Sequence, residues 1–356
     1  MRALTFLMIA GLVAAPGAGA QQILEIDYSV GRTIIHDEWR AMKYHNLIAD
    51  WDRNLLYVHD NEEPDGIMVF SLETGDWVRT ISTPRGEGPM EIPPLGGTWM
   101  SVADDGGLYV AGFQRVLMFD SNHNPVGSWT PQAPSAQRVC DLGGKPAVPV
   151  PNGVLRQETE TIGPNAIVGT SVDEIVSEED ARARNQAVLT GLSLNSRARI
   201  VCTEDRAFVV QAYEEGPDSV FVYDLSGGTG RMAVPTEFTE EWGCQINGRP
   251  CPPWSHKTHP SIDDRGNLVL FSGDMRVGGA IINPDSGCYA IVQKDMRTDM
   301  ARIPVRVRGD SVLVFQQDQG ETEDGRPHLF MGSANKASMH PLRRVSGEPC
   351  AGMAIP

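Results

Sequence analysis

The chain has 356 residues, with 46 Asp and Glu against 30 Lys and Arg, and a formal net charge of −16 at pH 7. This acidic balance argues against a protein that binds nucleic acid or anionic membranes, because both of those partners are themselves negatively charged. The length would suit about two domains, although closed β architectures use this much chain as one.

The first twenty residues have the pattern of a secretory signal. Arg2 gives the positive start, Leu4 to Val13 form a short apolar stretch, and Ala18-Gly19-Ala20 is a small-residue cleavage site. The apolar stretch is too short to span a bilayer. We therefore expect residues 1–20 to be removed and residues 21–356 to form one domain without a membrane span, in the periplasm or outside the cell.

The next elements have the pattern of short strands. Residues 23–30, ILEIDYSV, alternate at strand period and have no pairing partner nearby in the sequence. From Asn46 onwards, short β-rich runs alternate with turns rich in Asp, Gly and Asn. In the clearest unit, residues 96–129, strands at 108–110, 116–119 and 126–129 are separated by such turns. This is the pattern of a four-stranded antiparallel meander.

Residues 82–94, STPRGEGPMEIPP, lie between the first two of these units. Gly86-Glu87-Gly88 could begin a phosphate-binding glycine loop, but such a loop requires a helix after it. Pro93-Pro94 prevents a helix there. We interpret the stretch as a fixed joint between two units.

The unit recurs near residues 138, 199, 259 and 301, with the copy at 138 the weakest. Aligning the strand after each first turn, at intervals of 39 to 61 residues, gives one column of apolar residues: Leu56, Leu108, Ala147, Phe208, Leu268 and Val312. The ragged period is close to that of propeller blades. Between the third and fourth copies, residues 171–192 predict a helix, because Ser177 is placed as an N-cap before Glu178 and Glu179.

The predicted fold is therefore all-β. It is a six-bladed β-propeller of four-stranded antiparallel blades, with one short helix inserted between blades three and four. A ring of blades buries the apolar faces against one another. The strand at 23–30 is expected to close the ring by pairing with the last blade.

Two stretches resemble a known family. Residues 96–129 resemble an NHL-type blade, and GEGPME at 86–91 resembles the Gly-x-Gly-Pro-Gly-Glu joint of exported bacterial six-bladed propellers of that type. Gly86, Gly88, Pro89 and Glu91 match that joint, whereas Met90 stands where the family prefers glycine. The resemblance implies relatives that include metal-dependent lactonases and lyases with a metal in the central channel. Their ligand positions find no residue-by-residue match in this chain, so that activity is not carried over.

All six cysteines lie beyond residue 20, and an even number in an exported chain favours disulfides. Cys244 and Cys251 bracket a short loop and make the best pair. Joining Cys140 to Cys202 and Cys288 to Cys350 would use the remainder, although spacing alone leaves that connectivity open. A zinc site is the disfavoured alternative, because no C-x-x-C occurs.

Histidine and aspartate, which are also common metal ligands, occur in this chain only at spacings that are weak evidence for a metal site. His256 and His259 have a ligand-like spacing, but flanking prolines place them in a loop, which favours a solvated loop over a zinc site. Asp104-Asp105 and Asp263-Asp264 lack the ligand run of an EF-hand and are interpreted as strand turns.

A second column of the repeat predicts the binding site. Nine residues before the apolar column, the copies have Leu47, Trp99, Arg138, Arg199, His259 and Ile303, with Arg302 adjacent to the last. The first residues of innermost strands line the channel of a propeller. We therefore predict a basic ring of Arg138, Arg199, His259 and Arg302 beside Trp99, which could hold an anion. Pairing of these side chains with neighbouring Asp and Glu is the alternative.

The functional prediction is an exported, monomeric propeller that binds a small molecule or a protein through its channel-end loops, with an anionic ligand favoured by the basic ring. The chain contains no Gly-x-Ser-x-Gly, Walker or His-Glu-x-x-His motif. The alternative function is a lactonase-like, metal-dependent hydrolase or lyase with its site in the central channel. No cofactor is expected, with a channel metal such as calcium or zinc left open.

Overall fold

Strands make up all the regular structure of the described residues. The computed structural model describes residues 22–37, 42–60, 66–92, 98–112, 115–131, 138–150, 153–157, 160–162, 199–210, 219–226, 229–234, 245–246, 249–250, 258–272, 277–293, 302–317, 320–321, 327–328, 335–349 and 353. The predicted signal segment at 1–20 and the predicted helix within 171–192 lie outside these ranges. No helix long and apolar enough to cross a membrane occurs among the described residues.

Four separate sheets are four-stranded antiparallel meanders, as the Asp/Gly turn pattern predicts. The first contains β3 (Met42–Asp50), β4 (Leu55–Asp60), β5 (Gly66–Ser71) and β6 (Trp77–Ser82), and the second β7 (Trp99–Val102), β8 (Leu108–Gly112), β9 (Arg115–Phe119) and β10 (Pro125–Trp129). The third contains β11 (Cys140–Asp141), β12 (Pro146–Val150), β13 (Gly153–Arg156) and β14 (Glu160–Ile162), and the fourth β15 (Arg199–Cys202), β16 (Arg206–Val210), β17 (Ser219–Asp224) and β18 (Thr229–Ala233).

The remaining long strands form one nine-stranded sheet. Its main path runs β21 (Thr258–Ile262), β22 (Leu268–Ser272), β23 (Val277–Ile282), β24 (Tyr289–Gln293), β1 (Gln22–Ile26), β29 (Asn335–Ser346), β26 (Ser311–Gln317) and β25 (Arg302–Arg308), and β2 (Arg32–Asp37) also pairs with β29. Two short hairpins complete the described strands: β19 (Gln245–Ile246) with β20 (Arg249–Pro250), and β27 (Gly320–Glu321) with β28 (Pro327–His328).

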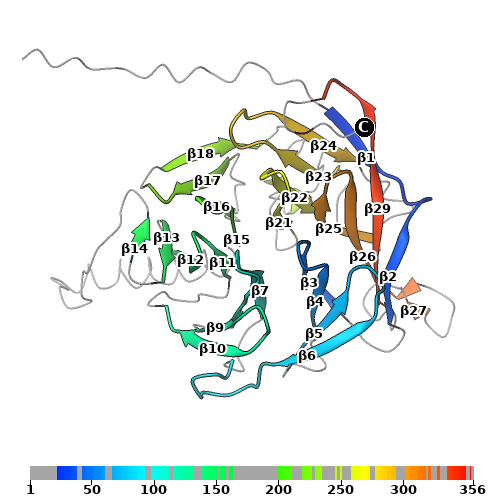
Figure 1. Cartoon of the computed structure of the whole chain (residues 1–356). Coiled ribbons are helices and arrows are strands. Elements are labelled where there is room, and N and C mark those ends of the chain that lie inside the picture. The colour runs from blue at the N-terminus through cyan, green and yellow to red at the C-terminus, as the bar shows by residue number, and fades with distance from the viewer. Residues whose placement is uncertain are drawn as a thin grey trace, which may run out of the picture.

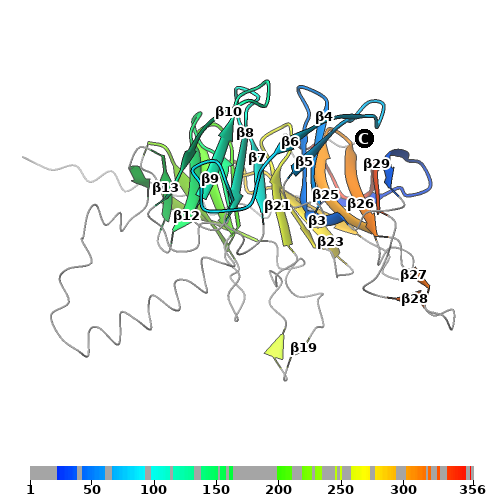
Figure 2. The same cartoon turned by 90° about the horizontal axis from the view of Figure 1, so that it is seen from below.

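The sheets are arranged as blades around a common centre, and Figure 1 shows this arrangement along the axis of the ring. The strands at the inner edges contact one another in the order β3, β7, β11, β15, β21 and β25, and β25 returns to contact β3. Figure 2 shows the same sheets from the side, with their strands running across the thickness of the ring. The described chain is therefore a ring of blade-like sheets with a propeller-like architecture.

The hydrophobic core lies between neighbouring sheets rather than in one central mass. Each apolar cluster joins two successive sheets; one contains Tyr57 and Val69 from the first sheet with Leu108 and Val110 from the second. The last cluster joins Phe315 to residues of the first sheet and so completes the ring. Burying every sheet face in this way supplies the main stabilisation, because apolar burial is the dominant favourable term in folding.

The apolar column of the repeat is confirmed. Its members all lie on the second strand of a meander or of the corresponding part of the nine-stranded sheet, and all are fully buried: Leu56, Leu108, Ala147, Phe208, Leu268 and Val312. The turns that precede these strands are also as predicted. For example, the backbone N–H of Ala103 donates to the carbonyl oxygen of Gly107 at 2.8 Å, across Asp104 and Asp105.

The N-terminal strand β1 lies beside the C-terminal strand β29, as Figure 1 shows. β1 pairs antiparallel with β29, which confirms the predicted pairing with the last blade, and it also pairs in parallel with β24. It therefore fills the gap between two blade-like parts of the nine-stranded sheet. The strand is shorter than predicted and ends at Ile26, because Asp27 and Tyr28 begin a turn in which the Asp27 carboxylate accepts a hydrogen bond from the Ser29 N–H.

Residues 84–92 form the predicted joint between the first two sheets. The N–H of Ile92 donates to the carbonyl oxygen of Pro84 at 2.8 Å, and the Glu91 carboxylate accepts from the N–H of Gly88 at 2.7 Å. The Arg115 guanidinium, from β9, donates to the carbonyl oxygens of Gly88 and Glu91. A Cβ atom at Gly86 would lie 2.0 Å from a Glu91 carboxylate oxygen, so a larger residue there would displace the Glu91 side chain from its hydrogen bond to Gly88.

A disulfide joins Cys140 on β11 to Cys202 on β15, with a Cα–Cα distance of 5.7 Å. It links two neighbouring inner strands, and it confirms one of the pairings that spacing alone left open. Cys288 is also disulfide-bonded. Cys244, Cys251 and Cys350 lie outside the described residues, so the Cys244–Cys251 and Cys288–Cys350 pairings stay predictions.

Candidate functional site

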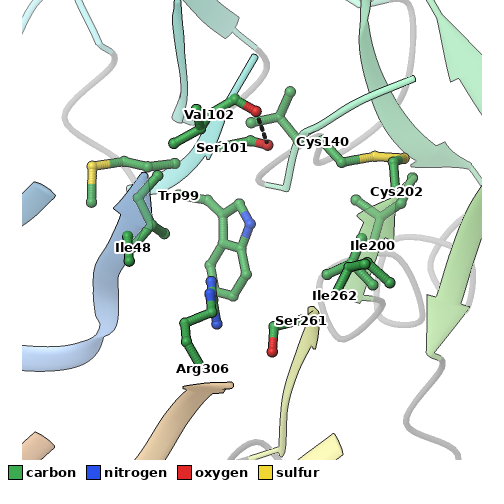
Figure 3. A pocket seen from close by; sticks show the side chains of 14 residues that line it. Ile48, Trp99, Ser101, Val102, Cys140, Ile200, Cys202, Ser261, Ile262 and Arg306 are labelled. Carbon is green, nitrogen blue, oxygen red and sulfur yellow. Dashed lines mark hydrogen bonds between the residues drawn. A yellow bond between two sulfur atoms is a disulfide. The ribbon is translucent and has the colours of Figure 1, made fainter. Parts of the chain in front are cut away.

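The centre of the ring contains a cavity of about 150 Å³. Every inner strand contributes to its wall, which is formed by Ile48, Ala49, Trp99, Met100, Ser101, Val102, Val139, Cys140, Ile200, Val201, Cys202, Ser261, Ile262 and Arg306. Figure 3 shows the indole of Trp99 in the middle of this space, with Arg306 and Ser261 approaching from β25 and β21. The cavity lies in the channel that the repeat predicts.

The Trp99 indole brings together two of the predicted basic residues. The Arg138 guanidinium carbon lies 4.0 Å from the centre of the ring, and that of Arg199 lies 5.6 Å from it. Both distances are within the range of a cation–π attraction. Trp99 begins β7, Arg199 begins β15 and Arg138 lies two residues before β11, so the three side chains gather at the channel end where these inner strands start.

The other two predicted ring members are placed only by their backbone. His259 lies on β21, opposite Phe271 of β22, and Arg302 begins β25, opposite Gln316 of β26. Their side chains lie outside the described part of the structure, as does all of His256. Membership of His259 and Arg302 in the basic ring therefore stays a prediction.

Arg306 is a channel residue that the repeat alignment misses. It follows a β-bulge between Pro304 and Arg306, where Val305 has no opposite residue on β26. Bulges turn a side chain away from the direction that strand alternation gives it. Val305 and Val307 are buried in the core, whereas Arg306 reaches the cavity. The only sign in the sequence of a cationic side chain from β25 in the channel is the presence of three arginines between residues 302 and 308. Their spacing does not indicate which of the three faces the channel.

The channel has an acidic opening next to this cavity. A second space of about 610 Å³ shares Ala49 and Val102 with the first and is lined by five aspartates, Asp50, Asp52, Asp104, Asp105 and Asp264, against two arginines. The carboxylate of Asp50 is paired with Arg53 at 2.6 Å, and that of Asp264 accepts the N–H of Gly309 at 2.8 Å. The repeat analysis identified these turns but did not predict that they meet around one opening.

The buried carboxyl group of Asp141 lies beside this opening and has a raised pKa. One of its oxygens accepts the N–H of Asp104 at 2.6 Å. Burial raises the pKa of Asp141 from 3.8 to about 6, and the negative charges of Asp104 and Asp105 add to that effect. Burial, together with the charges of Glu204 and Asp105, also raises the pKa of Asp104.

We expect the protein to become more stable as the pH falls through about 6. The folded state holds the Asp141 proton more tightly than the unfolded state, so its contribution is complete at low pH and is lost as the pH rises through the folded pKa. A shift of about two units corresponds to about 3 kcal/mol. Urea unfolding of the protein and of Asp141→Asn between about pH 4 and 8 measures the difference.

The expected control for that experiment is Asp224→Asn. Asp224 is a turn residue whose pKa is lowered by hydrogen bonds from Ser226, so its substitution should not reduce the gain in stability on acidification. If Asp141→Asn and the unchanged protein gain stability equally between pH 7 and 5, Asp141 is not the responsible group.

No cluster of three or more potential metal-ligating His, Cys, Asp or Glu side chains is found within the described ranges. The Asp263-Asp264 turn is a strand turn, in which the Asp263 carboxylate accepts hydrogen bonds from the N–H groups of Arg265 and Asn267. The alternative of a metal-dependent channel enzyme stays a prediction.

No family model and no curated protein matches the chain. Among solved structures, U3-55K matches at 10% identity with a TM-score of 0.48, covering 89% of this chain and 99% of that one. The WD40 domain of Pan2 from Neurospora crassa matches at 10% identity with a TM-score of 0.41, covering 91% of this chain and 96% of that one. Similarities at this level support no conclusion about this chain. The evidence for the ring of sheets is the strand pairing described above.

Proposed function

We propose that the chain is an exported, six-bladed β-propeller that binds an anionic ligand, or an anionic segment of a partner protein, at one end of its channel. The observation that supports this function is the placement of two guanidinium groups, from Arg138 and Arg199, over the ring of Trp99. The blade count is supported by the closed order of inner strands, with the nine-stranded sheet counted as two blades joined through β1. The Cys140–Cys202 disulfide supports an oxidising compartment.

Cations held against an aromatic ring suit the binding of an anion. Arg199 is 7% exposed, so a carboxylate that reached it would form its hydrogen bonds largely out of water. Such charge-assisted bonds are the strong ones in proteins, and guanidinium groups can make them in pairs. The net charge of −16 repels anions at long range, but at physiological salt this repulsion is screened beyond about 8 Å. A basic channel end can therefore operate on an acidic protein.

We expect a short polyglutamate peptide to bind the full-length protein, and both Arg138→Gln and Arg199→Gln to weaken that binding. Loss of one hydrogen bond to a charged group costs about 1.5–3 kcal/mol, which is about a 10- to 150-fold loss of affinity. Isothermal titration calorimetry at low and physiological salt measures the effect.

Arg231→Gln is a matched control for these variants. Arg231 is exposed on the outer strand β18, and its guanidinium lies over the ring of Phe221 at 4.7 Å, so the variant also loses an arginine–aromatic contact but leaves the channel unchanged. The proposal is wrong if the peptide does not bind, or if Arg231→Gln weakens binding as much as the channel variants do.

A further inference from the structure

The interior cavity contains one charged side chain among the described residues that line it, Arg306. One of its terminal nitrogens donates to the carbonyl oxygen of the adjacent Val305 at 2.8 Å, and no carboxylate of the described residues forms an ion pair with it. Burial lowers the pKa of Arg306 to about 10, so the group remains charged at neutral pH. The accessible surface of Arg306 is intermediate, and its side chain lines the cavity. A buried charge without an opposite charge is costly, and an anion in the cavity would remove that cost.

A hydroxyl group lies in the same wall and adds a hydrogen-bond donor. Ser261 is 3% exposed, and its Oγ has no hydrogen-bond partner among the described residues. Buried hydroxyl groups normally have a partner, so an unused one that faces a cavity indicates a position for a ligand atom. Figure 3 shows Ser261 and Arg306 on neighbouring strands on the same side of the cavity, with the Arg306 guanidinium beside the Trp99 indole.

The rest of the wall includes backbone groups. Four consecutive residues of β7, from Trp99 to Val102, line the cavity, although the side chains of a strand alternate between two directions. The backbone of β7 must therefore take part in the lining. The inner strands are edge strands, and an edge presents N–H and C=O groups that no neighbouring strand satisfies. These groups suit a ligand with hydroxyl groups.

Size and charge limit the ligand further. A cavity of about 150 Å³ holds a molecule the size of benzene, about six non-hydrogen atoms. One guanidinium with one hydroxyl matches the two oxygens and the single charge of a carboxylate. A phosphate dianion would retain an uncompensated negative charge in this space.

We propose that the interior cavity binds a small hydroxycarboxylate, with its carboxylate on Arg306 and the Ser261 hydroxyl and its hydroxyl group on the exposed edges of the inner strands. This inference deepens the proposed function, on which it rests, by adding a separate subsite inside the channel with its own ligand class.

Lactate and isobutyrate are the probes that test it, because they have the same shape and differ by a hydroxyl in place of a methyl group. In calorimetry with the full-length protein, lactate should bind one to one and at least about tenfold more tightly than isobutyrate, since the methyl group leaves the strand-edge groups without a partner. Inorganic phosphate should not compete. Arg306→Gln should weaken lactate binding by about 10- to 100-fold.

Ser261→Ala provides a second variant that keeps the fold. Its hydroxyl makes no hydrogen bond to any residue that the structure describes, so the Tm should not fall, while lactate affinity should fall by about tenfold. Arg308→Gln is the matched control; Arg308 lies two residues further along β25 but faces the acidic opening, so lactate affinity should not change.

Equal affinity for lactate and isobutyrate, or unchanged lactate binding by Arg306→Gln, would overturn the inference. If lactate does not bind while polyglutamate binding still depends on Arg199, the interior subsite is wrong and the channel-end function stands. If neither probe binds, both proposals fail.

Discussion

A chain that lacks residues 22–37 should not fold cooperatively. The deletion removes β1 and β2, and with them the buried side chains of Leu24, Ile26, Ile34 and Ile35. At about 1.5–3 kcal/mol for each buried aliphatic side chain, the loss is on the order of 6–12 kcal/mol, which is comparable to the whole stability of a typical domain. It also exposes the edges of β24 and β29 to other chains. Circular dichroism during urea unfolding and sedimentation of the soluble fraction measure the two effects.

A pair of point variants on β1 gives a graded version of the same experiment. Leu24 is fully buried, so Leu24→Ala should cost about 2–5 kcal/mol. Glu25 is exposed on the next position of the strand, and its ion pair with Arg343 spans 3.3 Å at the surface, so Glu25→Ala should change stability little. A truncated chain with the urea midpoint of the full-length protein would show that another segment closes the ring.

Replacing both Cys140 and Cys202 by alanine should lower the free energy of unfolding by about 4 kcal/mol. The bridge spans 62 positions of the sequence, and a cross-link of that span removes a large amount of chain entropy from the unfolded state. Urea unfolding under non-reducing conditions compares the double variant with the unchanged protein. Alkylation and intact mass of the denatured, unreduced protein first confirm that the bridge is present.

The double variant tests more than the bond itself, because the bridge fixes two strands that line the interior cavity. Lactate affinity should therefore fall together with stability. A loss of less than about 1 kcal/mol would show that the strands β11 and β15 are held mainly by the apolar cluster around Leu142, Ala147 and Ile200.

Local patterns were sufficient to predict the repeated strands of the blades, because apolar alternation and Asp/Gly turns act over only a few residues. The fully buried column that includes Leu108 and Leu268 is the clearest example. The same alignment predicted that Trp99, Arg138 and Arg199 lie at the start of inner strands, where the structure brings them together. The alignment could do so because equivalent positions of the repeat occupy equivalent places in successive sheets.

Features that depend on contacts between distant segments could not be predicted in this way. Arg306 faces the cavity next to a bulge in β25, and Pro304 alone does not show how that bulge turns the side chains after it. The acidic opening combines aspartates from turns as far apart as residues 50 and 264. Spacing alone did not select the Cys140–Cys202 pairing either, because the pairing depends on which inner strands are neighbours.

The double pairing of β1 has a consequence for the order of events during protein synthesis. β1 leaves the ribosome before the other described strands, but its two partners end at Gln293 and Ser346, among the last of them. The ring therefore cannot close until nearly the whole chain has been made, and closure is a contact of very long sequence separation, which is slow to form. Until then β1 and β24 carry open edges on which chains can aggregate.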